Sequence, residues 1–166
     1  MSLDAKTTLT IQGTVEETQD MGHKLRDPLN KTFGTDYADG TASDQCDVVW
    51  QDQRTLNATS EDLDMAGSLT DSRGNTVTFA DVKVIAIENT NTTAGQDLTF
   101  GPATANGVST IFGATTESIT IRAGGTLVLD APKDGYAITT GTADLVEIDA
   151  GANTVTYNII LMGTSS

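Results

Sequence analysis

The chain contains few of the residues from which covalent links and catalytic sites are built. Its 166 residues include one cysteine, Cys46, and one histidine, His23. A single thiol excludes an intrachain disulfide, and one cysteine with one histidine does not make a zinc site. A Ser-His-Asp triad would depend on His23, and no Gly-x-Ser-x-Gly motif accompanies it. We therefore expect no catalytic residues, no metal site and no cofactor.

Basic residues and long apolar segments are also scarce. Nine basic residues against 23 acidic ones give a formal net charge of −14. A chain this acidic is repelled by the phosphates of nucleic acids and by anionic membrane surfaces. No window approaches the ~20 apolar residues of a membrane-spanning helix, and residues 1–20 lack the pattern of a secretion signal. We expect neither nucleic-acid binding nor membrane binding.

Threonine and glycine are the residues that the chain has in abundance. There are 29 threonines and 16 glycines. Threonine is β-branched and favours strands, and glycine supplies the positive φ angles of tight turns. The composition predicts an all-β protein with many short strands.

Short apolar runs between turn residues recur every 8–12 residues or so from Asp47 onward, which is typical of a β-sandwich. We therefore assign residues 46–166 to one sandwich domain. The expected strands are 47–51, 62–69, 75–79, 82–88, 96–100, 109–113, 118–122, 126–130, 136–140, 144–149 and 154–162.

The first 45 residues differ from the rest. Residues 7–13 indicate one short strand, with Leu9 and Ile11 on the same face. The remainder shows no sustained strand or helix period, and it contains four turn formers: Gly22, Pro28, Gly34 and Gly40. A long structureless segment inside a compact domain is uncommon. We therefore predict an extended N-terminal arm or long loop that packs on a neighbouring subunit.

Four apolar residues are candidates for contacts with such a neighbour. Leu25, Leu29 and Phe33 lie in the arm, and Trp50 lies where the arm meets the sandwich. Buried aromatic side chains commonly anchor interfaces. Trp50 also lies in an expected strand, so a place in the core is the alternative.

The acidic residues leave two chemical alternatives open. Asp36, Asp39 and Asp44 share one turn-rich loop, but their spacing does not match an EF-hand, so a solvated loop is preferred to a calcium site. Asp62 and Asp64 alternate with apolar residues and are expected to face solvent. A lyase or glycosidase that uses these carboxylates is disfavoured, because the chain has few aromatic residues for a sugar-binding platform and no complete catalytic set.

Two segments resemble small virion proteins of tailed bacteriophages. The first is residues 58–90, and the second, at 119–163, reads ITIRAGGTLVLDAPKDGYAITTGTADLVEIDAGANTVTYNIILMG. The order of strand, glycine pair, strand, Asp-Ala-Pro turn and terminal strand in the second segment carries most of the resemblance. The likeness extends over residues 45–166.

The resemblance implies a jelly-roll-like sandwich that acts as a virion accessory protein. Proteins of the head cement or decoration type bind the major capsid protein at the capsid surface, commonly as homotrimers, after synthesis in the host cytoplasm. The resemblance therefore implies a structural protein and not an enzyme. The alternative is a tail, baseplate or host-surface protein that holds a glycan with loops such as 101–108 or 131–135.

Overall fold

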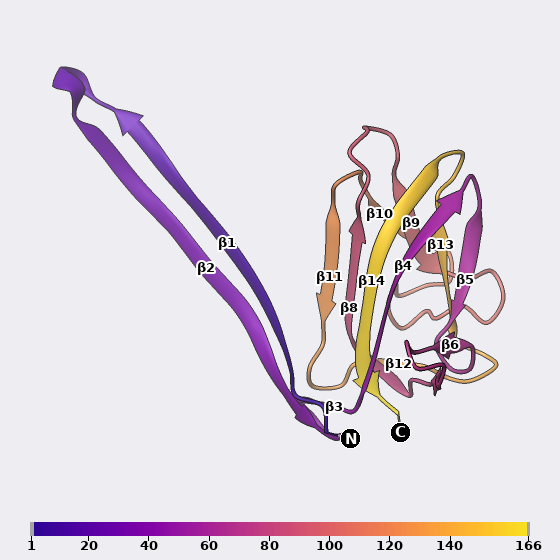
Figure 1. Ribbon diagram of the computed structural model, residues 1–166. Helices are drawn as coiled ribbons and strands as arrows, with labels where there is room; N and C mark the ends of the chain where they lie inside the picture. The colour runs from indigo at the N-terminus through magenta and orange to yellow at the C-terminus, as the bar shows by residue number, and fades with distance from the viewer. Residues whose placement is uncertain (1, 166) are drawn as a thin grey trace.

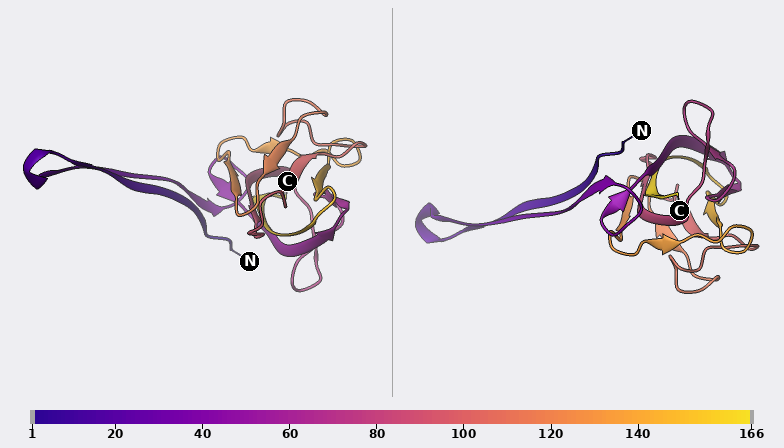
Figure 2. Two further views of the ribbon diagram at one scale, coloured as in Figure 1. Left: turned by 90° about the horizontal axis from the view of Figure 1, so that it is seen from above. Right: turned by 90° about the horizontal axis from the view of Figure 1, so that it is seen from below.

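The computed structural model describes residues 2–165 as a β-sandwich body with a long hairpin, the arm, projecting from it (Figure 1). The arm consists of β1 (Ala5–Thr18) and β2 (Lys24–Asp39), joined by the short 3-10 helix η1 (Asp20–Gly22). Both views in Figure 2 show the arm clear of the sandwich beyond its base. Among residues 2–165 no helix is long and apolar enough to cross a membrane.

Two antiparallel sheets form the body, one of five strands and one of four. The arm-side sheet has the order β11-β8-β14-β4, with the short β12 also paired to β8, and the far sheet has the order β10-β9-β13-β5. The strands of the arm-side sheet are β4 (Val48–Asn57), β8 (Asp81–Asn89), β11 (Thr126–Asp130), β12 (Tyr136–Ala137) and β14 (Thr154–Thr164). Those of the far sheet are β5 (Ser60–Asp64), β9 (Leu98–Pro102), β10 (Ile119–Ile121) and β13 (Leu145–Asp149).

The strand order is that of a jelly roll. If the eight main body strands are numbered along the chain from β4 to β14, leaving out the short β6, β7 and β12, the sheets read 1-8-3-6 and 2-7-4-5. Successive strands thus alternate between the sheets, except for β9 and β10, which pair with each other in the far sheet, and this is the interleaved pattern of two Greek keys. The predicted fold class, an all-β jelly-roll-like sandwich with an N-terminal arm, is confirmed.

The core lies between the two sheets and needs no covalent link. Alternate residues of each strand point inward, so that Ile85 and Ile87 of the arm-side sheet meet Phe100 and Ile148 of the far sheet in one buried cluster. Tyr157 closes one side of this core, where its hydroxyl donates a 2.6 Å hydrogen bond to Glu61. Burial and the neighbouring Glu61 raise the pKa of Tyr157 well above its usual value, so the phenol stays neutral.

Several predicted strands differ from the structure at their ends. The expected strand at 62–69 ends at Asp64, because the Asp64 carboxylate accepts the amide hydrogen of Ala66 and turns the chain. The expected strand at 75–79 is reduced to the two residues of β7 (Thr76–Val77), which pair with β6 (Leu69–Thr70).

The strand predicted at 109–113 is absent. This segment is a turn in which the amides of Phe112 and Gly113 donate to the carbonyl of Ser109. Phe112 instead packs edge-on against Phe100, with ring centroids 4.9 Å apart. The apolar run was therefore a signal of core contact and not of strand pairing.

The arm is extended as predicted, but it is a paired hairpin, whereas the sequence indicated only one short strand at 7–13. Residues 5–39 are almost entirely strand, and the turn falls at Met21 and Gly22, both of which have positive φ angles. Pro28 is compatible with a strand because β2 is paired on one side only along this stretch. The domain boundary predicted between residues 45 and 46 falls inside β3 (Gln45–Cys46), which pairs in parallel with the end of β2.

The last strand bends at a glycine that cannot carry a side chain. The register of β14 against β8 shifts between Met162 and Gly163, and a Cβ on Gly163 would lie 2.0 Å from the carbonyl oxygen of Asp81. We predict that Gly163→Ala lowers the free energy of unfolding by about 2 kcal/mol or more, because backbone must move to admit the methyl group.

Gly13→Ala is the matched control, since a Cβ at Gly13 in the arm meets nothing within 4 Å. Chemical denaturation of both variants should show a loss for Gly163→Ala alone. Equal midpoints for the two variants would contradict the close approach at β14.

Candidate interaction surface

The arm is an amphipathic ribbon because its two strands place odd-numbered residues on one face and even-numbered residues on the other. The register pairs Leu9 with Phe33 and Gly13 with Leu29, and directly opposite residues of an antiparallel pair share a face. We call the odd-numbered side the apolar arm face. Its large apolar residues are Leu9, Ile11, Val15, Leu25, Leu29 and Phe33.

The even-numbered face is polar, and cross-strand contacts hold it together. The hydroxyls of Thr10 and Thr32 lie 3.2 Å apart, and Arg26 forms an ion pair of 2.8 Å with Glu16. Lys6 pairs with Asp36 at 2.7 Å nearer the body. These exposed pairs contribute little stability individually, but they fix which face of the ribbon is polar.

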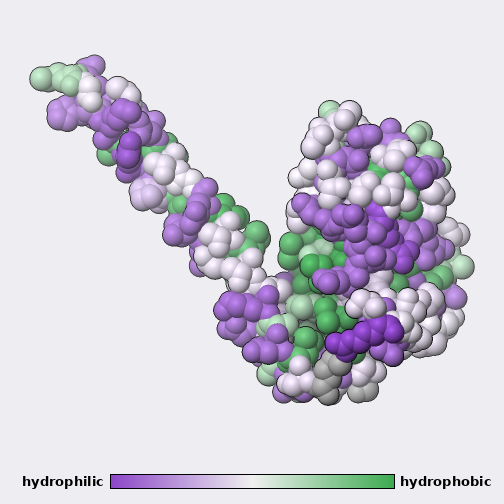
Figure 3. Space-filling view, viewed as in Figure 1, coloured by the Kyte–Doolittle hydropathy of each residue, from purple (hydrophilic) through white to green (hydrophobic). Residues whose placement is uncertain are grey.

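The apolar arm face is open to solvent over most of its length. Its six large apolar residues are between 49% and 72% exposed, and Val15 is the most exposed of them. In Figure 3 apolar side chains follow the side of the arm that faces the body. Scattered apolar residues on a surface are ordinary, but a continuous row on a projecting element marks an interaction site.

Asp130 of β11 anchors the base of the arm. Its carboxylate accepts hydrogen bonds from the hydroxyl of Tyr37 in β2 and from that of Thr7 in β1. Tyr37 is 1% exposed, and burial, followed by the hydrogen bond to Asp130, raises the pKa of its phenol far above the usual range. One carboxylate of the arm-side sheet thus holds both strands of the arm.

A small second core lies beneath the anchor. Tyr37 and Cys46 pack there against Val84 and Met162 of the arm-side sheet, with Leu3 and Ala5 at the margin. Cys46 is fully buried, and burial raises the pKa of its thiol to about 11. The thiol is therefore a structural residue, and its accessibility reports whether the arm base is closed.

The structure brings three of the four predicted contact residues together. Leu25, Leu29 and Phe33 all lie on the apolar arm face. Trp50 does not join them: it is 2% exposed in the sandwich core, and its indole nitrogen donates to the carbonyl of Thr70. The prediction of Trp50 as an interface residue is corrected to its alternative, a core residue, because inward-facing positions of β4 carry the large side chains.

Sequence reasoning missed the contribution of β1 to this surface. Leu9 and Ile11 were placed on a common face, but Val15 and the pairing with β2 were not foreseen. The alternation of polar and apolar residues along 5–18 could have indicated the longer strand. The threonines obscure this alternation, because threonine fits either face of a strand.

The carboxylates considered for calcium or catalysis serve separate partners. Asp36 pairs with Lys6, Asp39 accepts the amide hydrogen of Leu3, and Asp44 pairs with Lys133. Asp62 is exposed on β5, whereas Asp64 caps the turn that follows this strand. Among residues 2–165 no group of three or more His, Cys, Asp or Glu side chains could hold a metal ion.

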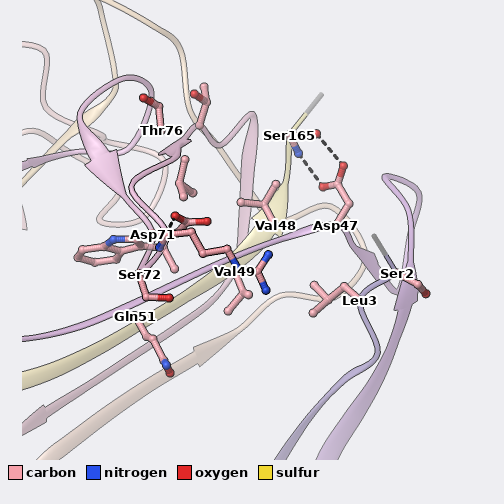
Figure 4. A pocket seen from close by; sticks show the side chains of 14 residues that line it. Ser2, Leu3, Asp47, Val48, Val49, Gln51, Asp71, Ser72, Thr76 and Ser165 are labelled. Carbon is pink, nitrogen blue, oxygen red and sulfur yellow. Dashed lines mark hydrogen bonds between the residues drawn. The ribbon is translucent and has the colours of Figure 1, made fainter.

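A cleft of about 590 Å³ lies beside the arm base, between β4 and the β6–β7 hairpin (Figure 4). Its two carboxylates are already engaged, since Asp47 accepts hydrogen bonds from Ser165, and Asp71 accepts them from Asn75. In Figure 4 the carboxylate of Asp47 points to Ser165 and lies well apart from Asp71. The cleft has no convergent set of polar groups of the kind that orients a small ligand.

No protein-family model, curated protein sequence or solved structure matches this chain.

The anchor at Asp130 can be tested through the buried thiol. We predict that Asp130→Ala increases the reaction rate of Cys46 with a thiol reagent at pH 8 by about tenfold. The reason is that loss of the two hydrogen bonds makes opening of the arm base easier by about 1–2 kcal/mol. Asp134→Ala, which removes an exposed carboxylate in the following turn, should leave the rate unchanged. An unchanged rate in Asp130→Ala would show that this contact does not hold the arm.

Proposed function

We propose that this protein is a structural subunit of a virion, a capsid cement or decoration protein that binds and stabilises the lattice of the major capsid protein. The observation that carries the proposal is the apolar arm face, a row of exposed apolar residues on a hairpin that projects from the body. Covering such a surface with another molecule removes apolar area from water and lowers the free energy. In this role the chain acts by adhesion and performs no catalysis.

The dimensions of the arm suit a subunit that links neighbours in a lattice. A strand of 14 residues such as β1 spans roughly 45–48 Å. The arm therefore extends the reach of one subunit well beyond the footprint of its own body. A subunit of this shape can contact more than one neighbour, and each contact adds to the cohesion of the shell.

Charge and fold support the same role. The net charge of −14 disfavours a position against packaged nucleic acid and suits the outer surface of a particle. The jelly-roll order of the body is an architecture that recurs in viral capsid proteins and also in lectins, so by itself it favours both the capsid role and the glycan-binding alternative. The resemblance of residues 45–166 to phage virion proteins favours the capsid role.

The number of copies per particle tests the proposal. We predict that densitometry of purified virions on a denaturing gel finds this polypeptide at a molar ratio to the major capsid protein of the same order as one. Virions that lack the polypeptide should release their genome at a lower temperature, because the shell has lost its added contacts. A few copies per particle would contradict the cement role and favour the tail or baseplate alternative.

A further inference from the structure

We propose that the apolar arm face is covered by a second copy of this chain, which receives it on the outer face of its arm-side sheet. The inference goes beyond the capsid role, because it names the occupant of the arm face and the surface that receives it. Four features of the chain support this contact: a second apolar surface, its continuity with the arm base, the lower charge of the arm, and the area of the two surfaces.

The receiving surface is a row of apolar residues across three strands of the arm-side sheet. Val128 of β11 lies opposite Ala86 of β8, which lies opposite Ile160 of β14. Val49 of β4 lies beside this row, opposite Met162. Val49, Val128 and Ile160 are 40–42% exposed, and they are the only large apolar residues of the described body that are exposed to this degree. Outside the arm, all the exposed large apolar residues therefore lie on one sheet.

The two apolar surfaces are continuous at the arm base. Tyr37, at the lower end of the apolar arm face, is already buried against Val84 and Met162, on the same outer sheet face as Ile160. Within one chain, the base of the apolar arm face therefore already packs on the outer face of the arm-side sheet, and the contact proposed between chains uses the same two faces over a greater length. Beyond the base the arm diverges from the sheet (Figure 1), so the rest of the apolar arm face does not meet the apolar row of its own body.

The arm is much less acidic than the body, so a contact of arm with body brings together fewer like charges than a contact between two bodies. Residues 5–39 carry four basic and six acidic side chains, a net charge of −2, whereas the rest of the chain carries five basic and seventeen acidic ones, a net charge of −12. Lys31 stands on the apolar arm face, 5.5 Å from the ring centroid of Phe33. The receiving face carries the exposed Glu88 one row beyond Ala86. The same arm face also carries Glu17 and Asp27 nearer its tip, so Lys31 is its one basic strand residue and the group that would pair with Glu88.

The area is sufficient for a stable pair. The arm beyond its base, from about residue 8 to residue 18 of β1, extends about 36 Å, so two strands spaced by about 5 Å present a face of roughly 360 Å². When two copies exchange arms reciprocally, four such faces are buried, about 1,400 Å² in total, which is within the range of a standard specific interface. One arm against an unrelated flat surface would bury about half of that.

The test uses charges placed on either face of the arm in the full chain. We expect the unmodified protein, of 17.3 kDa per chain, to form an oligomer when its mass is measured by light scattering during gel filtration. Leu29→Asp combined with Phe33→Asp should weaken self-association by more than about tenfold, because two charges would enter an apolar contact. Asn30→Asp combined with Thr32→Asp adds the same charge to the polar face of the same strand and should leave the mass unchanged.

The receiving surface is tested separately. Ile160→Asp should weaken self-association in the same way, whereas Thr120→Asp, an exposed position on β10 of the far sheet, should not. A variant that dissociates should keep the circular-dichroism spectrum and the unreactive Cys46 of the folded chain, which separates loss of the interface from loss of the fold. A monomeric unmodified protein at high concentration, or an oligomer insensitive to the arm and Ile160 changes, would overturn the inference.

These outcomes are independent of the virion role. A monomer in solution that is abundant in virions would overturn the present inference and leave the cement role standing. An oligomer that Leu29→Asp with Phe33→Asp dissociates, but that is found in few copies per particle, would support the contact between copies and contradict the cement role.

Discussion

The structure depends on one constraint: an apolar β-face must be covered by something. In the body, two sheets cover each other, and 23 buried apolar residues form one cluster between them. The arm has two strands and no second layer beyond its base, yet one of its faces carries six large exposed apolar residues, interrupted by Lys31, Asp27 and Glu17. A two-stranded ribbon is marginally stable in water by itself, so a cover supplied by another molecule explains both its length and its sequence.

The body serves this arm as a rigid base. Asp130 lies at the end of β11, and its two hydrogen bonds tie Thr7 and Tyr37 to a strand that is itself paired within the jelly roll. The small core around Cys46 makes the junction a packed contact rather than a flexible linker. The direction of the arm is therefore set by the fold.

The sequence predicted the body better than the arm, and the reasons are physical. β11 matches its predicted range, and β13 is one residue shorter, because turns rich in glycine or proline bound short alternating runs. The hairpin was missed because pairing of Ala5 with Tyr37 is a long-range contact, and threonine fits both faces of a strand. Leu25, Leu29 and Phe33 were chosen because they are apolar residues in a polar segment. They share a face because side chains alternate along a strand and these residues are spaced by four, an even number. Trp50 was misplaced because an aromatic residue in a strand fits a core and an interface equally well.

Whether a second copy covers the arm can be measured by amide hydrogen exchange of the arm over a range of protein concentrations. If it does, the amides of β1 and β2 beyond the base are protected, and their protection increases with concentration, because the second copy stabilises the ribbon. The amides of the body should exchange slowly at every concentration. Rapid exchange of the arm at all concentrations, with the body protected, would contradict this and show that no second copy covers the apolar arm face.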